Sequence, residues 1–213
     1  MLMDSPPVVF VIDDDPSVRR AIERLIGTVG LDVELFASSE EFLSAKRRDA
    51  VSCLVLDVRL PDRSGLDLQR ELATAKISIP IIFITSHGDI RMSVQAMKAR
   101  AVEFLPKPFR DQDLLDAIRA ALNRDRVRRG QEQQDSILGK RFEALTAREQ
   151  EILPWIVSGL LTKQIASEIG TSETTVKVHR GQLIRKMGAN SLADLVRMAE
   201  RLKIPLPDLD KPS

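Results

Sequence analysis

One short stretch, Cys53-Leu54-Val55-Leu56-Asp57, constrains the fold of this chain more than any other. Four consecutive apolar residues without alternation are typical of a strand that is buried on both faces, as in a parallel sheet. The run ends in a carboxylate, at the edge of the sheet where open α/β proteins place their binding sites. Because burial of an unpaired charge costs free energy, Asp57 is expected to have a ligand or a counter-charge.

Short apolar runs alternate with helical periodicity five times in the first 122 residues. The predicted strands lie at residues 8–12, 32–36, 53–57, 80–85 and 102–105, with helices between them that include one over 90–99 and a last one from Asp111. Right-handed crossovers turn such a chain into a parallel sheet with helices on both faces. The sequence therefore predicts an α/β fold: a flavodoxin-like, doubly wound five-stranded sheet of order 2-1-3-4-5.

This strand order brings several polar residues together at one edge of the sheet. Asp13 and Asp14 follow the first strand and Asp57 ends the third, so the three carboxylates are expected to converge. Carboxylates in one place need a counter-charge, and Mg²⁺ is the cation that this oxygen-rich set favours. Thr85, at the end of the fourth strand, adds a hydroxyl, and Lys107, after the fifth, adds an ammonium. Such a set is typical of a phosphoryl-transfer site with a carboxylate nucleophile.

At these positions the chain closely resembles the receiver domains of bacterial response regulators. The matching residues are Asp13-Asp14, Asp57, Pro61 and Gly65 in LPDRSG, Thr85 and Lys107-Pro108. The resemblance implies that Asp57 accepts a phosphoryl group from a sensor histidine kinase. It also implies that Asp14, Asp57 and the backbone carbonyl of Arg59 hold Mg²⁺, with Asp13 helping through water.

The same resemblance implies a switch beyond the phosphoacceptor. It assigns switch roles to Thr85 and to Phe104, an aromatic residue that moves inward on phosphorylation, and a cis peptide bond to Lys107-Pro108. Arg59 occupies a position over the site at which family members differ. Its guanidinium is expected to tune the lifetime of the phosphoryl group, by pairing with it or by hindering water.

The second half of the chain has a different pattern. Residues 123–134, NRDRVRRGQEQQ, are almost entirely polar, and we interpret this stretch as part of a partly helical linker. Capping signals and glycines then divide the rest into four short helices, of which the second and third form a helix-turn-helix. The predicted organisation is a receiver at 1–122, a linker at 123–142, a helix-turn-helix domain at 143–205 and a flexible tail at 206–213.

The third helix of this domain has side chains suited to DNA. A helix that enters the major groove needs donors, a methyl group and nearby cations. The segments LTAREQEIL, GLLTKQIASEIGTSETTVKVHR and LIRKM resemble the LuxR-type helix-turn-helix of the NarL/FixJ subfamily, whose third helix reads DNA and whose fourth dimerises. The candidate DNA-binding residues are Lys163, Thr174, Thr175, Lys177, Val178, Arg180, Gly181, Arg185 and Lys186.

Composition excludes several other classes. The 213 residues include one Cys and two His, too few for a structural zinc site, and no apolar run approaches the roughly 20 residues of a membrane span. Because the N-terminus also lacks the pattern of a signal peptide, a cytoplasmic protein is expected. Residues 1–122 hold 16 basic and 19 acidic residues, and residues 123–213 hold 16 and 12, which weakly favours an anionic partner for the second half.

Together these features predict a two-component transcription factor rather than an enzyme. Phosphorylation of Asp57 is expected to switch dimerisation and promoter binding, so the expected partners are a sensor histidine kinase, double-stranded DNA, a second copy of the chain and RNA polymerase. One alternative is an aspartyl-phosphate phosphatase or phosphotransferase, although Arg59 stands where the haloacid-dehalogenase-like enzymes have a second Asp. The other is a receiver joined to a protein-binding helical domain.

Overall fold

The computed structural model describes residues 6–86, 94, 96–99 and 101–207, and the chain divides into two compact units, 1–129 and 130–213. The division falls inside a single helix. Half of the helix predicted over 90–99, and most of the predicted tail, lie outside the described residues. Among the helices that are described, none combines the length and the apolar composition that a bilayer span requires.

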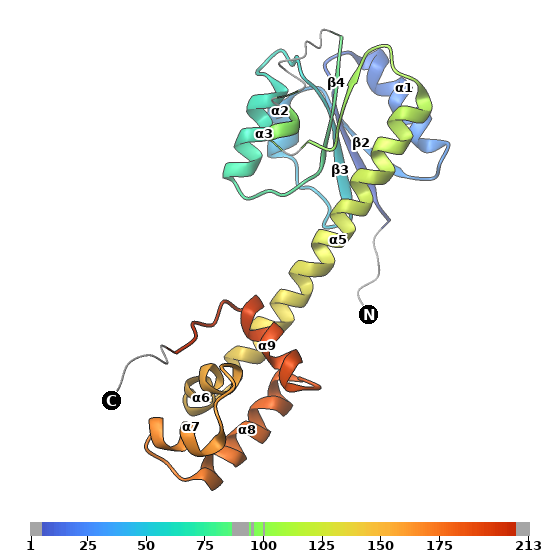
Figure 1. Cartoon of the computed structure of the whole chain (residues 1–213). Coiled ribbons are helices and arrows are strands. Elements are labelled where there is room, and N and C mark those ends of the chain that lie inside the picture. The colour runs from blue at the N-terminus through green and yellow to red at the C-terminus, as the bar shows by residue number, and fades with distance from the viewer. Residues whose placement is uncertain (1–5, 87–93, 95, 100, 208–213) are drawn as a thin grey trace. The chain divides into compact units, whose positions relative to one another are not determined.

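The first unit is a five-stranded parallel sheet, and its order β2-β1-β3-β4-β5 confirms the predicted fold class (Figure 1). Its strands are β1 (Val8–Ile12), β2 (Asp32–Phe36), β3 (Ser52–Asp57), β4 (Ile81–Thr85) and β5 (Glu103–Pro106). Its helices are α1 (Pro16–Gly27), α2 (Ser39–Ser44), α3 (Gly65–Thr74) and the beginning of α5 (Asp111–Glu143). The first helix starts as its sequence predicts, because the Asp15 side chain accepts the Ser17 N–H and a proline follows at the first helical position.

Alternation along the strands creates two hydrophobic cores, one on each face of the sheet. In β1, Val8, Phe10 and Ile12 belong to the core that α2 and α3 cover, whereas Val9 and Val11 belong to the core that α1 and α5 cover. The residues of β1 and β3 are all buried, so the continuous apolar runs of the sequence correspond to strands covered on both faces. The sheet thereby holds its carboxyl edge in fixed register.

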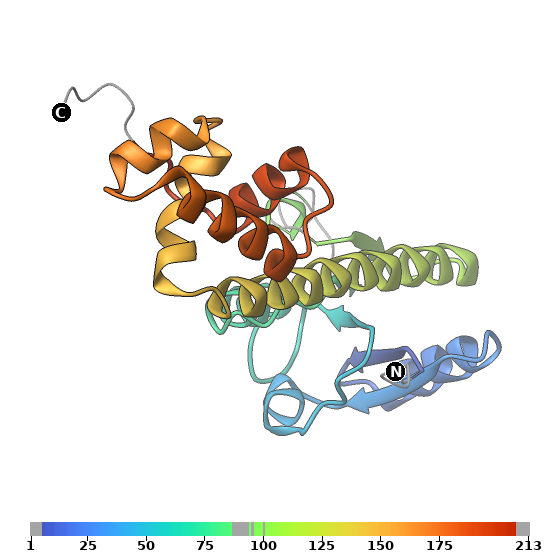
Figure 2. The same cartoon turned by 90° about the horizontal axis from the view of Figure 1, so that it is seen from below.

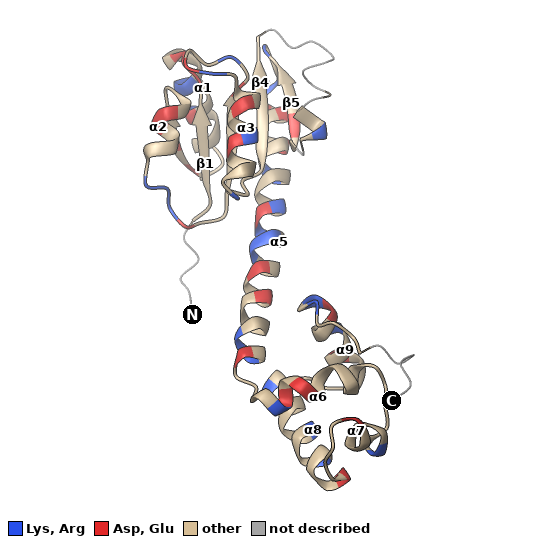
Figure 3. Cartoon of the chain, turned by 90° about the vertical axis from the view of Figure 1, so that its left-hand side faces the viewer, with Lys and Arg blue, Asp and Glu red and all other residues tan. Residues whose placement is uncertain are grey.

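Helix α5 continues unbroken through the stretch that was predicted to be only partly helical (Figure 2). Acidic and basic residues alternate along it (Figure 3), and one acid, Asp125, is completely buried. The Asp125 carboxylate accepts the backbone N–H of Ser52, the first residue of β3, at 3.0 Å. It also accepts hydrogen bonds from Arg128 at 2.5 Å and from Arg129 at 2.8 Å. We call these four residues the Asp125 cluster; it fixes α5 against the amino end of the strand that ends in Asp57.

The second unit is entirely helical. It contains the end of α5 together with α6 (Ala147–Val157), α7 (Thr162–Glu168), α8 (Glu173–Met187) and α9 (Leu192–Arg201). The capping box of α6 is present as predicted, and Gly188 ends α8 in the left-handed conformation at φ 69°. One core forms between the helices; its fully buried side chains include Ile152, Ile165 and Leu195. The apolar side of α9 therefore contributes to the interior of the unit.

Candidate phosphoacceptor site and DNA-binding helix

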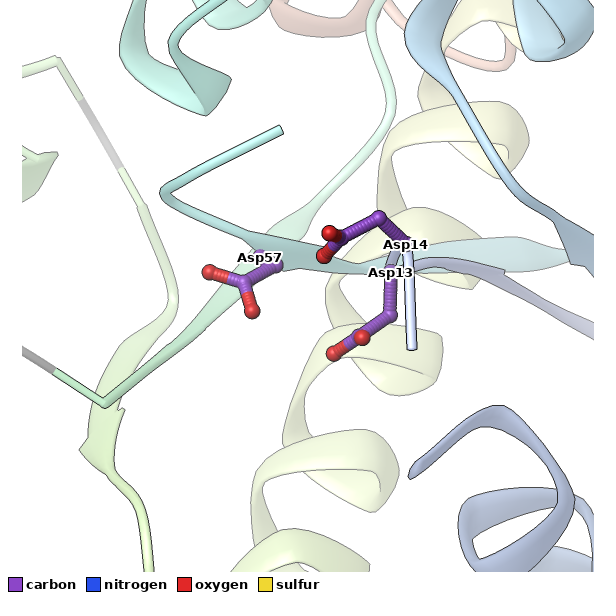
Figure 4. Close-up of side chains that lie close together, drawn as sticks. All are labelled: Asp13, Asp14 and Asp57. Carbon is purple, nitrogen blue, oxygen red and sulfur yellow. The ribbon is translucent and has the colours of Figure 1, made fainter. Parts of the chain in front are cut away.

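Strand register places the acidic residues side by side. Ile12 of β1 lies opposite Leu56 of β3, so Asp13, which follows β1, and Asp57, which ends β3, are neighbours at the same edge. The carboxylates of Asp13, Asp14 and Asp57 each have an oxygen within 4.8 Å of the others (Figure 4). Asp13 is completely buried, Asp57 is 6% exposed and Asp14 is exposed. The convergence that strand order predicted is present in the structure.

Lys107 supplies a counter-charge to this group. Its Nζ lies 2.6 Å from Asp13 Oδ2 and 2.6 Å from Asp57 Oδ2, so one ammonium bridges the two buried carboxylates. Its backbone N–H is bonded to the Thr85 carbonyl at 2.7 Å, and the Lys107-Pro108 bond is cis. Burial alone would lower the pKa of Lys107, but its hydrogen bonds to the two carboxylates outweigh that effect and raise the pKa. Burial raises the pKa of Asp13, against the hydrogen bond from Lys107 that lowers it.

The second oxygen of Asp57 is held by the backbone. Asp57 Oδ1 accepts the N–H of Arg59 at 2.9 Å, while Oδ2 accepts from Lys107. The carboxylate is therefore fixed from two sides, by the backbone and by a side chain. The Arg59 side chain is exposed, on the loop that follows β3.

The two candidate switch residues lie at neighbouring strand ends. Thr85 is completely buried at the end of β4, opposite Pro106. Phe104 lies opposite Phe83, with ring centroids 6.3 Å apart, and is half-buried. The structure thus places Thr85 beside the strand that leads into Lys107, and Phe104 on the same pair of strands.

The donor chemistry of the site fits Mg²⁺. The three clustered side chains offer only carboxylate oxygens, the ligands that a hard divalent cation prefers. Two of the three, Asp13 and Asp57, are buried where ionised acids need a counter-charge, and among the described residues Lys107 forms an ion pair with each of them. Within the described part of the chain, Asp13, Asp14 and Asp57 form a carboxylate cluster typical of a divalent-metal site.

Two further contacts support the site, and the sequence did not reveal them. Arg19 of α1 donates from Nη1 to the backbone carbonyl of Asp13 at 2.5 Å. Asp62, on the loop after β3, accepts hydrogen bonds from Ser39 and Glu40 at the start of α2. A basic residue six positions after an acid, or an acid in a turn, is too common in sequences to indicate such contacts.

In the second unit, α8 presents one face to the core and another to solvent. Val176, Leu183 and Met187 are buried, and the Ser172 side chain caps the helix by accepting the Thr175 N–H at 3.1 Å. Of the candidate DNA contacts, Thr174, Lys177, Val178, Gly181 and Arg185 are exposed, as is Lys163 of α7, while Thr175 and Arg180 are half-buried.

Lys186 differs from the other candidates because it has a partner within the unit. Its Nζ lies 2.7 Å from Oε2 of Glu149, the capping-box acid of α6, which is completely buried. Burial alone would raise the pKa of Glu149, but the hydrogen bonds from Lys186 and Thr146 lower it. This ion pair joins α8 to the start of α6, so Lys186 has a structural role whatever it contributes to DNA binding.

Known families match both units. Residues 9–119 match the family described as "Response regulator receiver domain", and residues 143–199 match "Bacterial regulatory proteins, luxR family". Nodulation protein W of Bradyrhizobium diazoefficiens is 54% identical over 92% of this chain and 87% of its own. The response regulator protein TodT of Pseudomonas putida is 48% identical over 95% and 89%.

Solved structures agree with these relatives. The low-resolution structure of response regulator StyR is 47% identical, covers 92% of this chain and all of its own, and superposes with a TM-score of 0.82. Full-length FixJ from B. japonicum is 35% identical, with 93% and 98% coverage and a TM-score of 0.56.

Proposed function

Because the chain belongs to the two-component response regulators of the NarL/FixJ subfamily, transcriptional regulators with a receiver and a LuxR-type DNA-binding domain, we propose that Asp57 is its phosphoacceptor and controls DNA binding. The observation that supports Asp57 most directly is the Lys107 bridge. It pairs one ammonium with the buried carboxylates of Asp57 and Asp13. An ammonium so placed stabilises charge on a phosphoryl group that arrives at Asp57.

The proposed reaction transfers the phosphoryl group from a histidine of a sensor kinase. An oxygen of Asp57 forms the new bond to phosphorus, while the bond from phosphorus to the histidine nitrogen breaks and its electron pair stays on the imidazole. Mg²⁺ held by Asp13, Asp14, Asp57 and the carbonyl of Arg59 would neutralise charge on the transferred group. We propose that the protein acts on no external substrate and only gains and loses this group.

Phosphorylation adds about −1.5 to −2 charge units and three acceptor oxygens at Asp57. We propose that Lys107 and the Thr85 hydroxyl move to these oxygens, and that Phe104 fills the space beside β4. The new contacts favour one of two receiver conformations, so the phosphoryl group shifts a population by its differential interaction with them. In the favoured state the receiver dimerises beside β4 and β5, or releases the helical domain.

The proposed output is binding of α8 in the major groove of promoter DNA. The exposed side chains of Thr174 and Lys177 can donate hydrogen bonds to bases, and that of Val178 can contact a thymine methyl group. The side chains of Lys163 and Arg185 can bind phosphates. Two-fold symmetry of a homodimer would then match a two-fold operator. We further propose RNA polymerase as a partner and, since the chromosome is the target, a cytoplasmic location.

A selection from a randomised DNA duplex pool tests this proposal. Full-length protein is incubated with Mg²⁺, with or without beryllofluoride as a phosphoryl mimic, and the bound DNA is sequenced while light scattering gives the mass of the protein. We expect beryllofluoride to produce a dimer and to enrich a two-fold symmetric motif. Equal enrichment with and without beryllofluoride would contradict control by Asp57, and absence of any salt-sensitive DNA binding would favour a protein-binding helical domain.

Arg59 is expected to prolong the life of the phosphoryl group. Its backbone N–H already holds Asp57, and its exposed guanidinium is near enough along the chain to form a charge-assisted pair with phosphate oxygens. In Arg59→Ala we expect dephosphorylation to be about 3- to 10-fold faster. This is the change in rate that follows from losing a hydrogen bond worth roughly 1 kcal/mol. Loss of radiolabelled phosphate over time measures the rate, with Arg70→Ala, an exposed arginine paired with Asp67, as the control. Identical rates for Arg59→Ala and wild type would refute the role.

A further inference from the structure

The loop at residues 58–64, between β3 and α3, is firmly held at its two ends. The N–H of Val58 is bonded to the Ile84 carbonyl at 3.0 Å, and the N–H of Gly65 is bonded to the Val58 carbonyl at 2.8 Å. Gly65 approaches the sheet so closely that a Cβ there would lie 2.4 Å from the Asp57 carbonyl oxygen, so no other residue fits. Between these ends, Arg59 forms an isolated antiparallel bridge with Ser64, and the Arg63 side chain is paired with Glu71 of α3.

The tip of this loop is held by Asp62. Its Oδ2 accepts the hydroxyl hydrogen of Ser39 and, at 3.3 Å, the backbone N–H of Glu40, both at the start of α2. Ser39 is completely buried, and its hydroxyl therefore needs this acceptor. Burial alone would raise the pKa of Asp62, but the hydrogen bonds from Ser39 and Glu40 lower it, so the carboxylate is ionised at neutral pH.

The position of this loop matters for the proposed metal site. Asp57 ends β3, and Asp13 directly follows β1 with its N–H bonded to the Phe36 carbonyl at 3.3 Å, so the sheet fixes the backbone of both. The fourth proposed ligand, the Arg59 carbonyl, belongs to the loop instead. Mg²⁺ demands nearly ideal octahedral geometry, so a ligand on a loop is effective only if the loop is held still.

We propose that Asp62 is a positioning residue for phosphorylation of Asp57: through Ser39 it holds the loop that presents the Arg59 carbonyl to Mg²⁺. This inference rests on the proposed function of the site. Asp62 acts through the loop and touches neither the phosphoryl group nor the ion. Loss of such an outer contact at a metal site typically weakens metal binding by about 10-fold or more.

Calorimetric titration of the full-length protein with Mg²⁺ alone tests this role without any phosphoryl donor. In Asp62→Ala we expect the dissociation constant for Mg²⁺ to rise about 10-fold. Asp62→Asn keeps an acceptor oxygen for Ser39 and should recover most of the affinity. Ser39→Ala should also weaken Mg²⁺ binding, but by no more than Asp62→Ala, because the Glu40 N–H bond to Asp62 remains. The double variant should be no weaker than Asp62→Ala, which already removes the contact with Ser39. Asp116→Ala, an exposed acid paired with Arg119 on α5, is the matched control.

Kinetics with acetyl phosphate provide a second readout. The Mg²⁺ concentration for half-maximal labelling should rise in Asp62→Ala, while the rate at saturating Mg²⁺ stays close to that of wild type. Unchanged Mg²⁺ affinity in Asp62→Ala would overturn the proposal, even with lowered thermal stability. If Asp62→Ala fails to fold, the Mg²⁺ affinity of Ser39→Ala is measured instead, and an unchanged affinity would likewise overturn the proposal. Failure of wild type itself to bind Mg²⁺ or to accept phosphate would instead refute the proposed function.

Discussion

Replacement of Asp57 by asparagine is expected to abolish phosphorylation while the receiver stays folded. The amide has almost the same shape, and its single oxygen can keep one of the two hydrogen bonds, from Lys107 or from the Arg59 N–H, that the two carboxylate oxygens accept. It has no negative charge, however, so the nucleophile is lost. Lys107 keeps its ion pair with Asp13, which limits the effect on stability. We expect labelling by acetyl phosphate to fall by about 100-fold or more, to the background of the assay.

The measurement is incorporation of radiolabelled phosphate, followed by binding to DNA selected with the wild-type protein. Asp67→Asn changes an exposed acid of α3 that is paired with Arg70, and it should label normally. Asp57→Asn should bind DNA like unphosphorylated wild type under all conditions. Tight binding by this variant, equal to that of phosphorylated wild type, would show that the switch does not depend on Asp57.

Replacement of Asp125 by alanine is expected to destabilise the receiver by about 2–4 kcal/mol. The buried carboxylate accepts from Ser52, Arg128 and Arg129, so its removal leaves a backbone N–H and two guanidinium groups without this acceptor. The arginine side chains are about one third exposed, and water therefore compensates part of their loss. The lost bond to Ser52 has no such compensation, because Ser52 is buried.

Two spectroscopic signals separate this effect from general unfolding. The chain has one tryptophan and no tyrosine, and Trp155 lies in α6 of the helical unit. Urea unfolding followed by circular dichroism should show an earlier receiver transition in Asp125→Ala, while the fluorescence transition of Trp155 stays in place. Asp116→Ala, on an exposed turn of the same helix, controls for helix propensity. An unchanged receiver transition would show that the Asp125 cluster contributes no net stability.

The sequence predicted the sheet and the convergence of its acids, because both depend on local patterns. Strand burial is visible as apolar runs, and right-handed crossovers leave few ways to order five strands. Once that order is known, the residue after each strand must lie at the same edge. The predicted fold class and family membership are confirmed by the strand order and by the matching families.

Contacts between distant parts of the chain were not predictable in this way. Asp125 lies in a stretch that looks polar on every side, and nothing near it indicates a bond to Ser52, 73 positions earlier. For the same reason α5 was expected to be only partly helical beyond residue 122. Lys186 followed a DNA-binding pattern, yet its ammonium is paired with buried Glu149 from another helix. Polar residues gain such partners through tertiary structure, which periodicity does not describe.

The Asp125 cluster also has a consequence for how this regulator can be shortened or recombined. A receiver cut after residue 122 keeps every strand but loses the acceptor of the Ser52 N–H, and so begins β3 with an unsatisfied buried donor. The transplantable module therefore ends after Arg129. Chimeras that exchange output domains should join within residues 130–134, which are exposed along their whole length. Fusions made upstream would lose activity through instability of the receiver and give a false impression of incompatible partners.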